Sequence, residues 1–110
     1  MAINSSNGKL FFDVKTPLGF RVRTTLSYWN IITMVKHPVM RGKESQVKKA
    51  LEHPDEIRQS RKDPTVFLFY RAAGSRRSIC AVVKRLDRDG FLITAYLTDS
   101  VKEGDRVWPR

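Results

Sequence analysis

Hydrophobic and polar residues alternate along the chain with two different periods, which divide it into predicted elements. From residue 27 to residue 51 the apolar side chains recur at helical spacing, whereas from residue 56 to residue 98 they recur at every second position. Before them, the β-rich runs 10–15 and 20–25 flank the sequence Thr-Pro-Leu-Gly, which is typical of a tight turn. The pattern therefore predicts a hairpin, then helices, then further strands.

Two helices are predicted after the hairpin. Ser27 is a typical N-cap residue, and Pro38 ends the first helix directly after His37. The second helix is predicted over 43–51 and ends before Pro54. The apolar positions are Tyr28, Trp29, Ile31, Ile32 and Val35 in the first helix, and Val47, Ala50 and Leu51 in the second.

Four strands are predicted in the second half of the chain, over 56–60, 65–71, 78–86 and 91–98. Their connections are short, which favours an antiparallel meander. The last segment, 100–110, is predicted to form a short final strand or an arm laid across the sheet. Residues 1–9 are polar and small and are predicted to be a disordered N-terminus, so that 10–110 form one domain.

Alternation along the four later strands sorts their side chains into two faces, because residues i and i+2 point to the same side. One face is continuously apolar, and we expect the two helices to cover it. This face is predicted to hold Ile57, Phe67, Phe69, Ile79, Ala81, Val83, Phe91, Ile93, Ala95 and Leu97. The opposite face is half polar and is predicted to hold Arg58, Ser60, Tyr70, Lys84, Thr94, Tyr96 and Thr98.

Lys84 ends an otherwise apolar run in a strand that has a central pattern, so its ammonium group requires a partner. With a short loop before the next strand, Lys84 is expected opposite Leu92 and diagonal to Thr94, within reach of its hydroxyl. The same register predicts the cross-strand pairs Val82–Thr94 and Cys80–Tyr96.

Charge and composition narrow the possible functions. The chain has 110 residues, a net charge of +10 and a pI of about 10.3. This excess of basic groups attracts polyanions, so nucleic acid is the leading partner, with an anionic membrane surface and an acidic protein as alternatives. No apolar run approaches the ~18 residues that span a bilayer, and the start shows no signal-peptide pattern, so we expect a cytoplasmic protein.

Metal and disulfide chemistry find little support in the sequence. Cys80 is the single cysteine, lies within an apolar run and is expected to be a buried thiol. Together with His37 and His53 it shows no metal-ligand spacing, so we expect no structural zinc and no cofactor.

A sheet face that carries Arg, Lys, Tyr and Thr suits phosphate chemistry. Guanidinium forks and ammonium groups bind phosphate oxygens, tyrosine stacks on a base or moves a proton, and threonine donates a hydrogen bond. An imidazole exchanges protons near neutral pH, which makes His37 the leading general acid or base. Ordinary structural roles also fit: helix capping for His37, a solvent face for Thr94, Tyr96 and Thr98, and solvated loop charges for Arg71, Arg76 and Arg77.

The order of motifs from Trp29 to Trp108 resembles a known family. The motifs are W-x7-H-P, L-E-H-P-D-E-I-R-Q-S-R-x-D-P, L-F-Y-R, A-V-V-K and G-F-L-I-T-A-Y-L-T-D, followed by Lys102, Gly104 and Trp108. Together they resemble the phage and bacterial nuclease-like domains grouped with barnase, EndoU, colicin tRNase and RelE toxins, the BECR fold. The resemblance covers about 80 of the 110 residues.

The resemblance implies an α+β fold, with an N-terminal hairpin and two helices packed on one face of a curved, four- to five-stranded antiparallel sheet. Active members of the family cut RNA without a metal, because a ribose 2′-hydroxyl attacks the adjacent phosphate and leaves a 2′,3′-cyclic phosphate. The predicted catalytic residues are His37 and Tyr96 as acid or base, Arg58 and Lys84 as stabilisers of the phosphorane, and Thr94 as a phosphate-positioning group. The predicted nucleic-acid contacts are Arg41, Ser60, Arg61, Tyr70, Arg71, Arg76 and Arg77. Arg41 and Glu44, near the start of the second helix, are weaker candidates for a catalytic role.

Three functions follow as hypotheses. The leading one is a metal-independent endoribonuclease, a toxin or phage-associated effector that acts on RNA such as tRNA or mRNA and is restrained by an acidic antitoxin or immunity protein. The second is a non-catalytic nucleic-acid-binding module of the same fold. The third is a phage or bacterial interaction protein that binds no nucleic acid.

Overall fold

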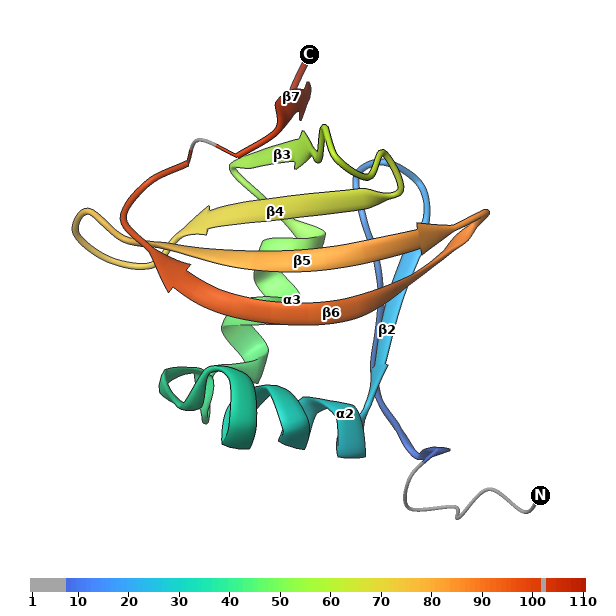
Figure 1. Ribbon diagram of the computed structural model, residues 1–110, viewed down its shortest axis with the longest axis vertical. Helices are drawn as coiled ribbons and strands as arrows, with labels where there is room; N and C mark the ends of the chain where they lie inside the picture. The colour runs from blue at the N-terminus through green and yellow to red at the C-terminus, as the bar shows by residue number, and fades with distance from the viewer. Residues whose placement is uncertain (1–7, 102) are drawn as a thin grey trace.

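The computed structural model describes residues 8–101 and 103–110. A hairpin, a helical region and five further strands follow one another along the chain (Figure 1). The helical segments are α2 (Leu26–Ile31), a π-helical turn η1 (Ile32–Lys36), a 3₁₀ turn η2 (Pro38–Met40) and α3 (Glu44–Glu52). The strands are β1 (Leu10–Lys15), β2 (Arg21–Thr25), β3 (Glu56–Gln59), β4 (Val66–Ala72), β5 (Ser78–Leu86), β6 (Asp89–Thr98) and β7 (Asp105–Trp108).

All seven strands join one open, mixed sheet in the order β1-β2-β6-β5-β4-β3-β7. Strands β3 to β6 form the predicted antiparallel meander, and β7 pairs with the outer edge of β3 (Figure 1). The fold is α+β as predicted, but the expectation of four to five antiparallel strands with the hairpin on their face is wrong. The hairpin lies in the sheet, since residues 21–23 of β2 pair in parallel with 89–91 of β6 and so cover an edge that both strands would otherwise expose.

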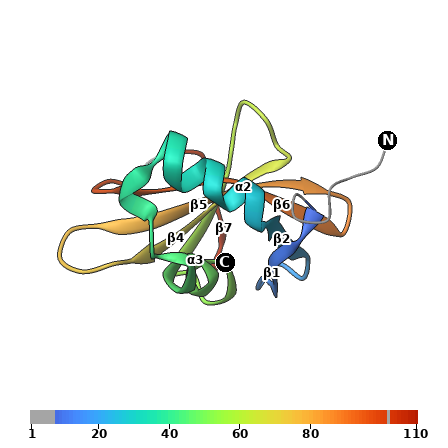
Figure 2. The ribbon, with the colours of Figure 1, turned by 90° about the horizontal axis from the view of Figure 1, so that it is seen from below.

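The helical segments bury apolar side chains against one side of the sheet. Helix α3 contacts β1, β4 and β5, and its Val47, Ala50 and Leu51 are fully buried (Figures 1 and 2). Trp29 of α2 and Ile32 of η1 join the same core, in which each fully buried large side chain contributes ~1.5–3 kcal/mol. Among the described residues, no helix is both long and apolar enough to cross a membrane.

Helix α2 begins two residues earlier than predicted. Thr25, the last residue of β2, has an extended backbone, and its Oγ1 accepts a hydrogen bond from the backbone N–H of Tyr28 at 3.1 Å. Thr25 is therefore the N-cap in place of Ser27, because the strand runs directly into the helix. At the other end the helix widens into η1, where the N–H of His37 donates to the carbonyl of Ile32 at 2.7 Å.

Strand β6 contains a bulge that alternation does not reveal. Val82 pairs with Thr94 and Val83 with Leu92, so Ile93 is an extra residue in β6. The carbonyl of Ile93 accepts hydrogen bonds from outside the sheet, from Tyr28 of α2 and Lys36 of η1. The bulge is therefore where the helical region is fastened to β6.

The bulge changes which side chains enter the core. Leu92 is buried and Phe91 is 46% exposed, so the expectation that Phe91 and Ile93 lie in the apolar face is wrong. Lys84 lies opposite Phe91 and not opposite Leu92. The predicted pairs Val82–Thr94 and Cys80–Tyr96 are confirmed.

The other side of the meander, which α2 and α3 leave uncovered, is called the open face here. It carries a smaller cluster in which Leu68, Tyr70 and Cys80 are buried and Val82, Tyr96 and Val101 are partly buried. Val101 belongs to the connection from β6 to β7, called the crossover segment and described at 99–101 and 103–104. This connection passes the ends of β5 and β4 on its way to β7 (Figure 1).

Candidate functional site

His37 and Tyr96 meet at the edge of the open face. Their ring centroids lie 5.6 Å apart, with an angle of 45° between the ring planes. Tyr96 is on β6, and His37 directly follows η1, which the Lys36 ammonium fastens to the Ile93 carbonyl at 3.1 Å. The π-helical turn therefore determines where the imidazole lies, and turns of this kind are frequent at functional sites.

Tyr96 is the end of a row of three side chains that crosses the sheet. Tyr70 on β4 pairs with Cys80 on β5, and Cys80 pairs with Tyr96. Burial raises the pKa of both tyrosines above their usual range, and hydrogen bonding with Cys80 adds to this effect. Burial likewise raises the pKa of the Cys80 thiol to about 11. At neutral pH the two hydroxyls and the thiol are thus all protonated.

A hollow of about 260 Å³ lies beside this row, lined by Tyr70, Tyr96, Thr98, Ser100 and Glu103. The Glu103 carboxylate adds to the rise in the pKa of both tyrosines and of Cys80, so it acts on the whole row. Glu103 is not among the predicted site residues, because the crossover segment shows no alternation that would assign it to a face. Arg77, from the β4–β5 loop, lines a neighbouring hollow that shares Thr98.

Thr94 also lies near the site, one pleat from Tyr96 on β6. Its pairing with Val82 places it in the open-face row next to that of Cys80 and Tyr96. Its Oγ1 is buried and has no hydrogen-bond partner among the described residues. An unpaired buried hydroxyl is costly and calls for an explanation, of which a role toward a bound ligand is one.

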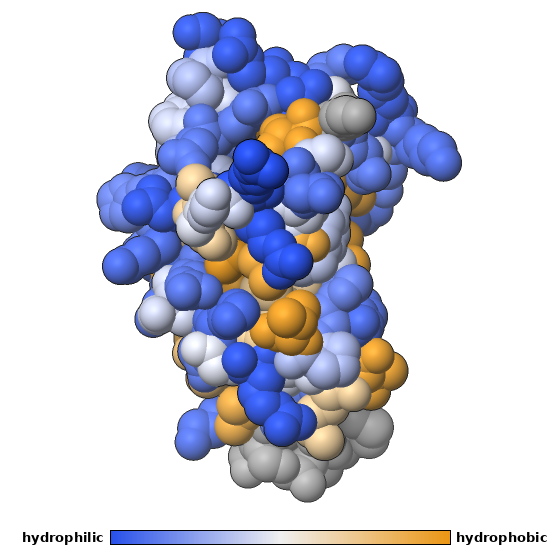
Figure 3. Space-filling model, turned by 90° about the vertical axis from the view of Figure 1, so that its left-hand side faces the viewer, coloured by the Kyte–Doolittle hydropathy of each residue, from blue (hydrophilic) through white to orange (hydrophobic). Residues whose placement is uncertain are grey.

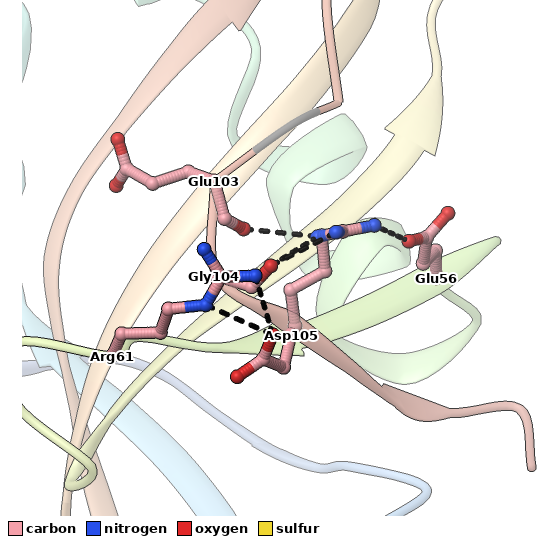
Figure 4. Close-up of polar contacts among 6 residues, drawn as sticks. Glu56, Arg61, Glu103, Gly104 and Asp105 are labelled. Carbon is pink, nitrogen blue, oxygen red and sulfur yellow. Dashed lines mark hydrogen bonds and ion pairs between the residues drawn. The ribbon is translucent and has the colours of Figure 1, made fainter.

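Arg58 lies on the open face, opposite Leu68, but other parts of the chain occupy its guanidinium (Figure 4 labels the partners Glu56, Glu103 and Gly104). It forms an ion pair with Glu56, and its guanidinium donates to the carbonyls of Gly104 at 2.9 Å and Glu103 at 3.0 Å. Next to it, Arg61 pairs with Asp105 at 2.7 Å. These contacts hold the crossover segment and the start of β7 against β3.

Lys84 has a partner as the sequence requires, but the partner is Asp63 and not Thr94. The Lys84 ammonium lies 2.9 Å from the Asp63 carboxylate, which also accepts from the N–H and hydroxyl of Thr65. Hydrogen bonds from Thr65 and Lys84 lower the pKa of Asp63 to about 2. Lys84 is four positions from Cys80, or about 13 Å along β5, and so lies away from the His37–Tyr96 pair.

The other predicted contacts are scattered. Ser60 accepts a hydrogen bond from the N–H of Asp63 at 3.3 Å, and Arg71 donates to the carbonyl of His53 beyond α3. Arg41 is exposed after η2, and Arg76 is exposed in the β4–β5 loop. The structure therefore brings together His37, Tyr70, Thr94 and Tyr96, but not the predicted arginines.

The surface around the site is largely hydrophilic, with hydrophobic patches between the polar side chains (Figure 3). The helical turns η1 and η2 contribute exposed apolar side chains, namely Met34, Val35 and Val39. Over the described part of the chain, no group of three or more His, Cys, Asp or Glu side chains is placed to hold a metal ion.

Comparison with known proteins adds no functional assignment: no family model matches the chain, and no curated protein or solved structure is significantly similar to it.

Proposed function

We propose that the chain is a metal-independent endoribonuclease whose active site surrounds His37, Thr94 and Tyr96. The observation that carries the proposal is the contact between the His37 and Tyr96 rings, whose centroids lie 5.6 Å apart at the open face. The resemblance in motif order supports it, as does the net charge of +10, which favours a polyanionic substrate. The resemblance likewise motivates an acidic antitoxin or immunity protein as a partner of so basic a chain.

The proposed reaction joins the ribose 2′-oxygen to the adjacent phosphorus and breaks the bond from phosphorus to the 5′-oxygen. His37 accepts the proton of the 2′-hydroxyl, and the Tyr96 hydroxyl donates its proton to the leaving 5′-oxygen. Since burial raises the pKa of Tyr96, its hydroxyl serves as a proton donor and not as a base. The products are a 2′,3′-cyclic phosphate and a 5′-hydroxyl, and return of the proton from His37 to the Tyr96 oxygen restores both groups.

Two further residues are assigned by their contacts. The unpaired Oγ1 of Thr94 donates to a non-bridging phosphate oxygen, whose charge grows in the transition state. The sequence predicts Arg58, with Lys84, as a stabiliser of the phosphorane, but its hydrogen bonds to the crossover segment make it a positioning residue.

Non-catalytic binding of nucleic acid is the second candidate function, and one specific observation favours it. The two strand cations expected to stabilise the phosphorane are each paired with a carboxylate, Arg58 with Glu56 and Lys84 with Asp63. A binding module needs no such stabilisation. Its affinity for RNA falls steeply with rising salt, and the RNA stays intact.

The experiment is incubation of the purified protein with total RNA in EDTA, with analysis of the product ends. We expect cleavage with 2′,3′-cyclic ends, and a loss of ~100-fold or more in the His37→Ala variant. His53→Ala is the matched control, because His53 is exposed and lies beyond α3. Undiminished cleavage by His37→Ala, or no cleavage by the folded wild type, would overturn the nuclease.

A further inference from the structure

A second, larger hollow opens where β2 and β6 separate. The two strands pair only as far as Arg23 and Phe91, and the residues that follow on each strand line a hollow of about 410 Å³. Its walls are mostly apolar, and Tyr28 of α2 contributes to one side of it. The lining residues are Leu10, Arg23, Thr24, Thr25, Tyr28, Phe91, Leu92 and Ile93.

Aromatic surface and an unpaired polar atom meet in this hollow. The Phe91 ring is 46% exposed, although phenylalanine is usually buried. The Nε of Arg23 is buried and has no hydrogen-bond partner among the described residues. The rest of the Arg23 guanidinium pairs with Asp89 at 3.2 Å, and the Asp13 carboxylate is 3.8 Å from Nε, too far for a hydrogen bond. A ligand that fits must therefore combine a flat apolar body with hydrogen-bonding atoms at its edge.

Lys36 connects the hollow to the proposed active site. Its ammonium lies 3.0 Å from the Tyr28 hydroxyl and 3.1 Å from the Ile93 carbonyl, and both residues line the hollow. Among the described residues, no carboxylate lies within ion-pair distance of Lys36, so its charge is uncompensated. Lys36 directly precedes His37 in the sequence. An uncompensated cation between an aromatic hollow and an acid–base pair suits the phosphate of a nucleotide.

We propose that this hollow is a base-binding subsite for a single-stranded RNA. A splayed base stacks on Phe91, its edge meets Arg23, which pairs with Phe91 across the two strands, and Lys36 holds the phosphate that leads to His37. The inference rests on the proposed function for the identity of the ligand. It adds that one nucleotide beside the cleaved phosphate is selected by its base.

The test is a binding cycle with uncleavable 2′-O-methyl RNA, in which the base of one nucleotide at a time is replaced by an abasic sugar. In the wild type, we expect one abasic position to weaken binding ~10-fold. Phe91→Ala is expected to weaken binding of the intact RNA by a similar factor. In this variant, the same abasic substitution is expected to weaken binding no further. Leu86→Ala is the matched control, because Leu86 is an exposed apolar residue outside the hollow and this variant is expected to bind like the wild type.

The phosphate contact is tested by the salt dependence of the same affinity. Lys36→Met is expected to make the slope of log K against log salt shallower by ~0.7, the value for one phosphate on a single strand. Lys49→Met, on α3, is expected to leave the slope unchanged.

Two outcomes distinguish the subsite from the nuclease. Coupling here means that an abasic substitution weakens binding by the wild type but not by Phe91→Ala. RNA cleavage without such coupling at any position overturns the subsite and leaves the nuclease intact. Coupling in a protein that never cuts RNA supports the subsite and overturns the nuclease. Equal binding of intact and abasic RNA by the wild type also overturns the subsite.

Discussion

Lys84 on β5 and Asp63 in the β3–β4 loop form an ion pair with 2.9 Å between Nζ and the carboxylate. Asp63 also accepts two hydrogen bonds from Thr65, so the loop, the start of β4 and the end of β5 are joined at one carboxylate. Lys84, which the sequence predicts to lie within reach of Thr94 on β6, thus stabilises a loop instead.

The first prediction concerns stability in acid. The pKa of Asp63 is lowered to about 2 in the fold, chiefly by Thr65 and then by Lys84. A carboxylate with a lowered pKa stabilises the fold above its unfolded pKa of about 3.9, and this contribution is lost as pH falls toward 2. We expect Thr65→Val to reduce the acid-induced fall in Tm, and Lys84→Met to reduce it less. Identical Tm curves against pH for the wild type and Thr65→Val would contradict this account.

A second prediction concerns alkaline pH. The pKa values of Cys80, Tyr70 and Tyr96 are all raised in the fold, mainly by burial. Groups with raised pKa values contribute stability below their unfolded pKa, and that stability is lost as pH rises beyond it, here above about pH 9. In Cys80→Ala, the fall in Tm at alkaline pH is expected to begin at a higher pH, closer to the range in which tyrosine ionises. The measurement is Tm from pH 7 upward, compared between this variant and the wild type.

The third prediction tests the contacts of the crossover segment with β3. Arg58→Ala removes the hydrogen bonds to Glu103 and Gly104 and leaves Glu56 without its cation. Because the Arg58 side chain is only 20% exposed, we expect a loss of about 2 kcal/mol in the free energy of unfolding. Limited proteolysis is expected to cut this variant within 99–104 before the rest of the domain. If the protease instead cut the β4–β5 loop first, this would count against a role of Arg58 in holding the crossover segment.

Gly104 provides a fourth and independent test of the same contact. Its φ is +81°, and a Cβ at this position would collide with the backbone carbonyl of Gln59. Gly42 has nearly the same φ, +80°, with nothing near enough to touch a Cβ. Gly42→Ala therefore reports the backbone cost alone, about 1 kcal/mol, and Gly104→Ala is expected to lose clearly more in urea unfolding. Equal losses would show that the approach to β3 is not tight.

A fifth prediction links the β6 bulge to activity. Tyr28→Phe removes the hydroxyl that donates to the Ile93 carbonyl at 2.7 Å and accepts from Lys36 at 3.0 Å. We expect a loss of about 1 kcal/mol in stability, and a lower RNA cleavage rate because η1 then holds His37 less firmly. An unchanged rate with the expected loss of stability would separate this anchor from catalysis.

Local patterns predict the strands of this protein well. The run from Ser78 to Leu86 is predicted and observed with the same bounds, since apolar alternation and turn residues at both ends act within a few residues. The hairpin turn and α3 are also found within a residue or two of prediction. What fails is non-local: the pairing of β2 with β6 and the extra residue at Ile93 depend on where the helical region contacts the sheet.

The candidate site divides in the same way. Alternation correctly places Tyr70, Thr94 and Tyr96 on the open face, because β4 is regular and the two β6 residues both follow the bulge, where the pairing with β5 is regular again. It cannot foresee that Arg58 is occupied by the crossover segment, nor that Lys36 lies over the bulge. These contacts join segments far apart in the sequence, and no local period encodes them.

The parallel pairing of β2 with β6 also has a consequence for how the chain reaches its native state. Residues 21–23 find their partners only at 89–91, which are synthesised later. Such long-range closure is slow, because the loop between the partners must be ordered first. Until residues 89–91 are available, the edge of β2 that faces β6 stays unpaired, and a fragment that ends before residue 89 is expected to be prone to aggregation.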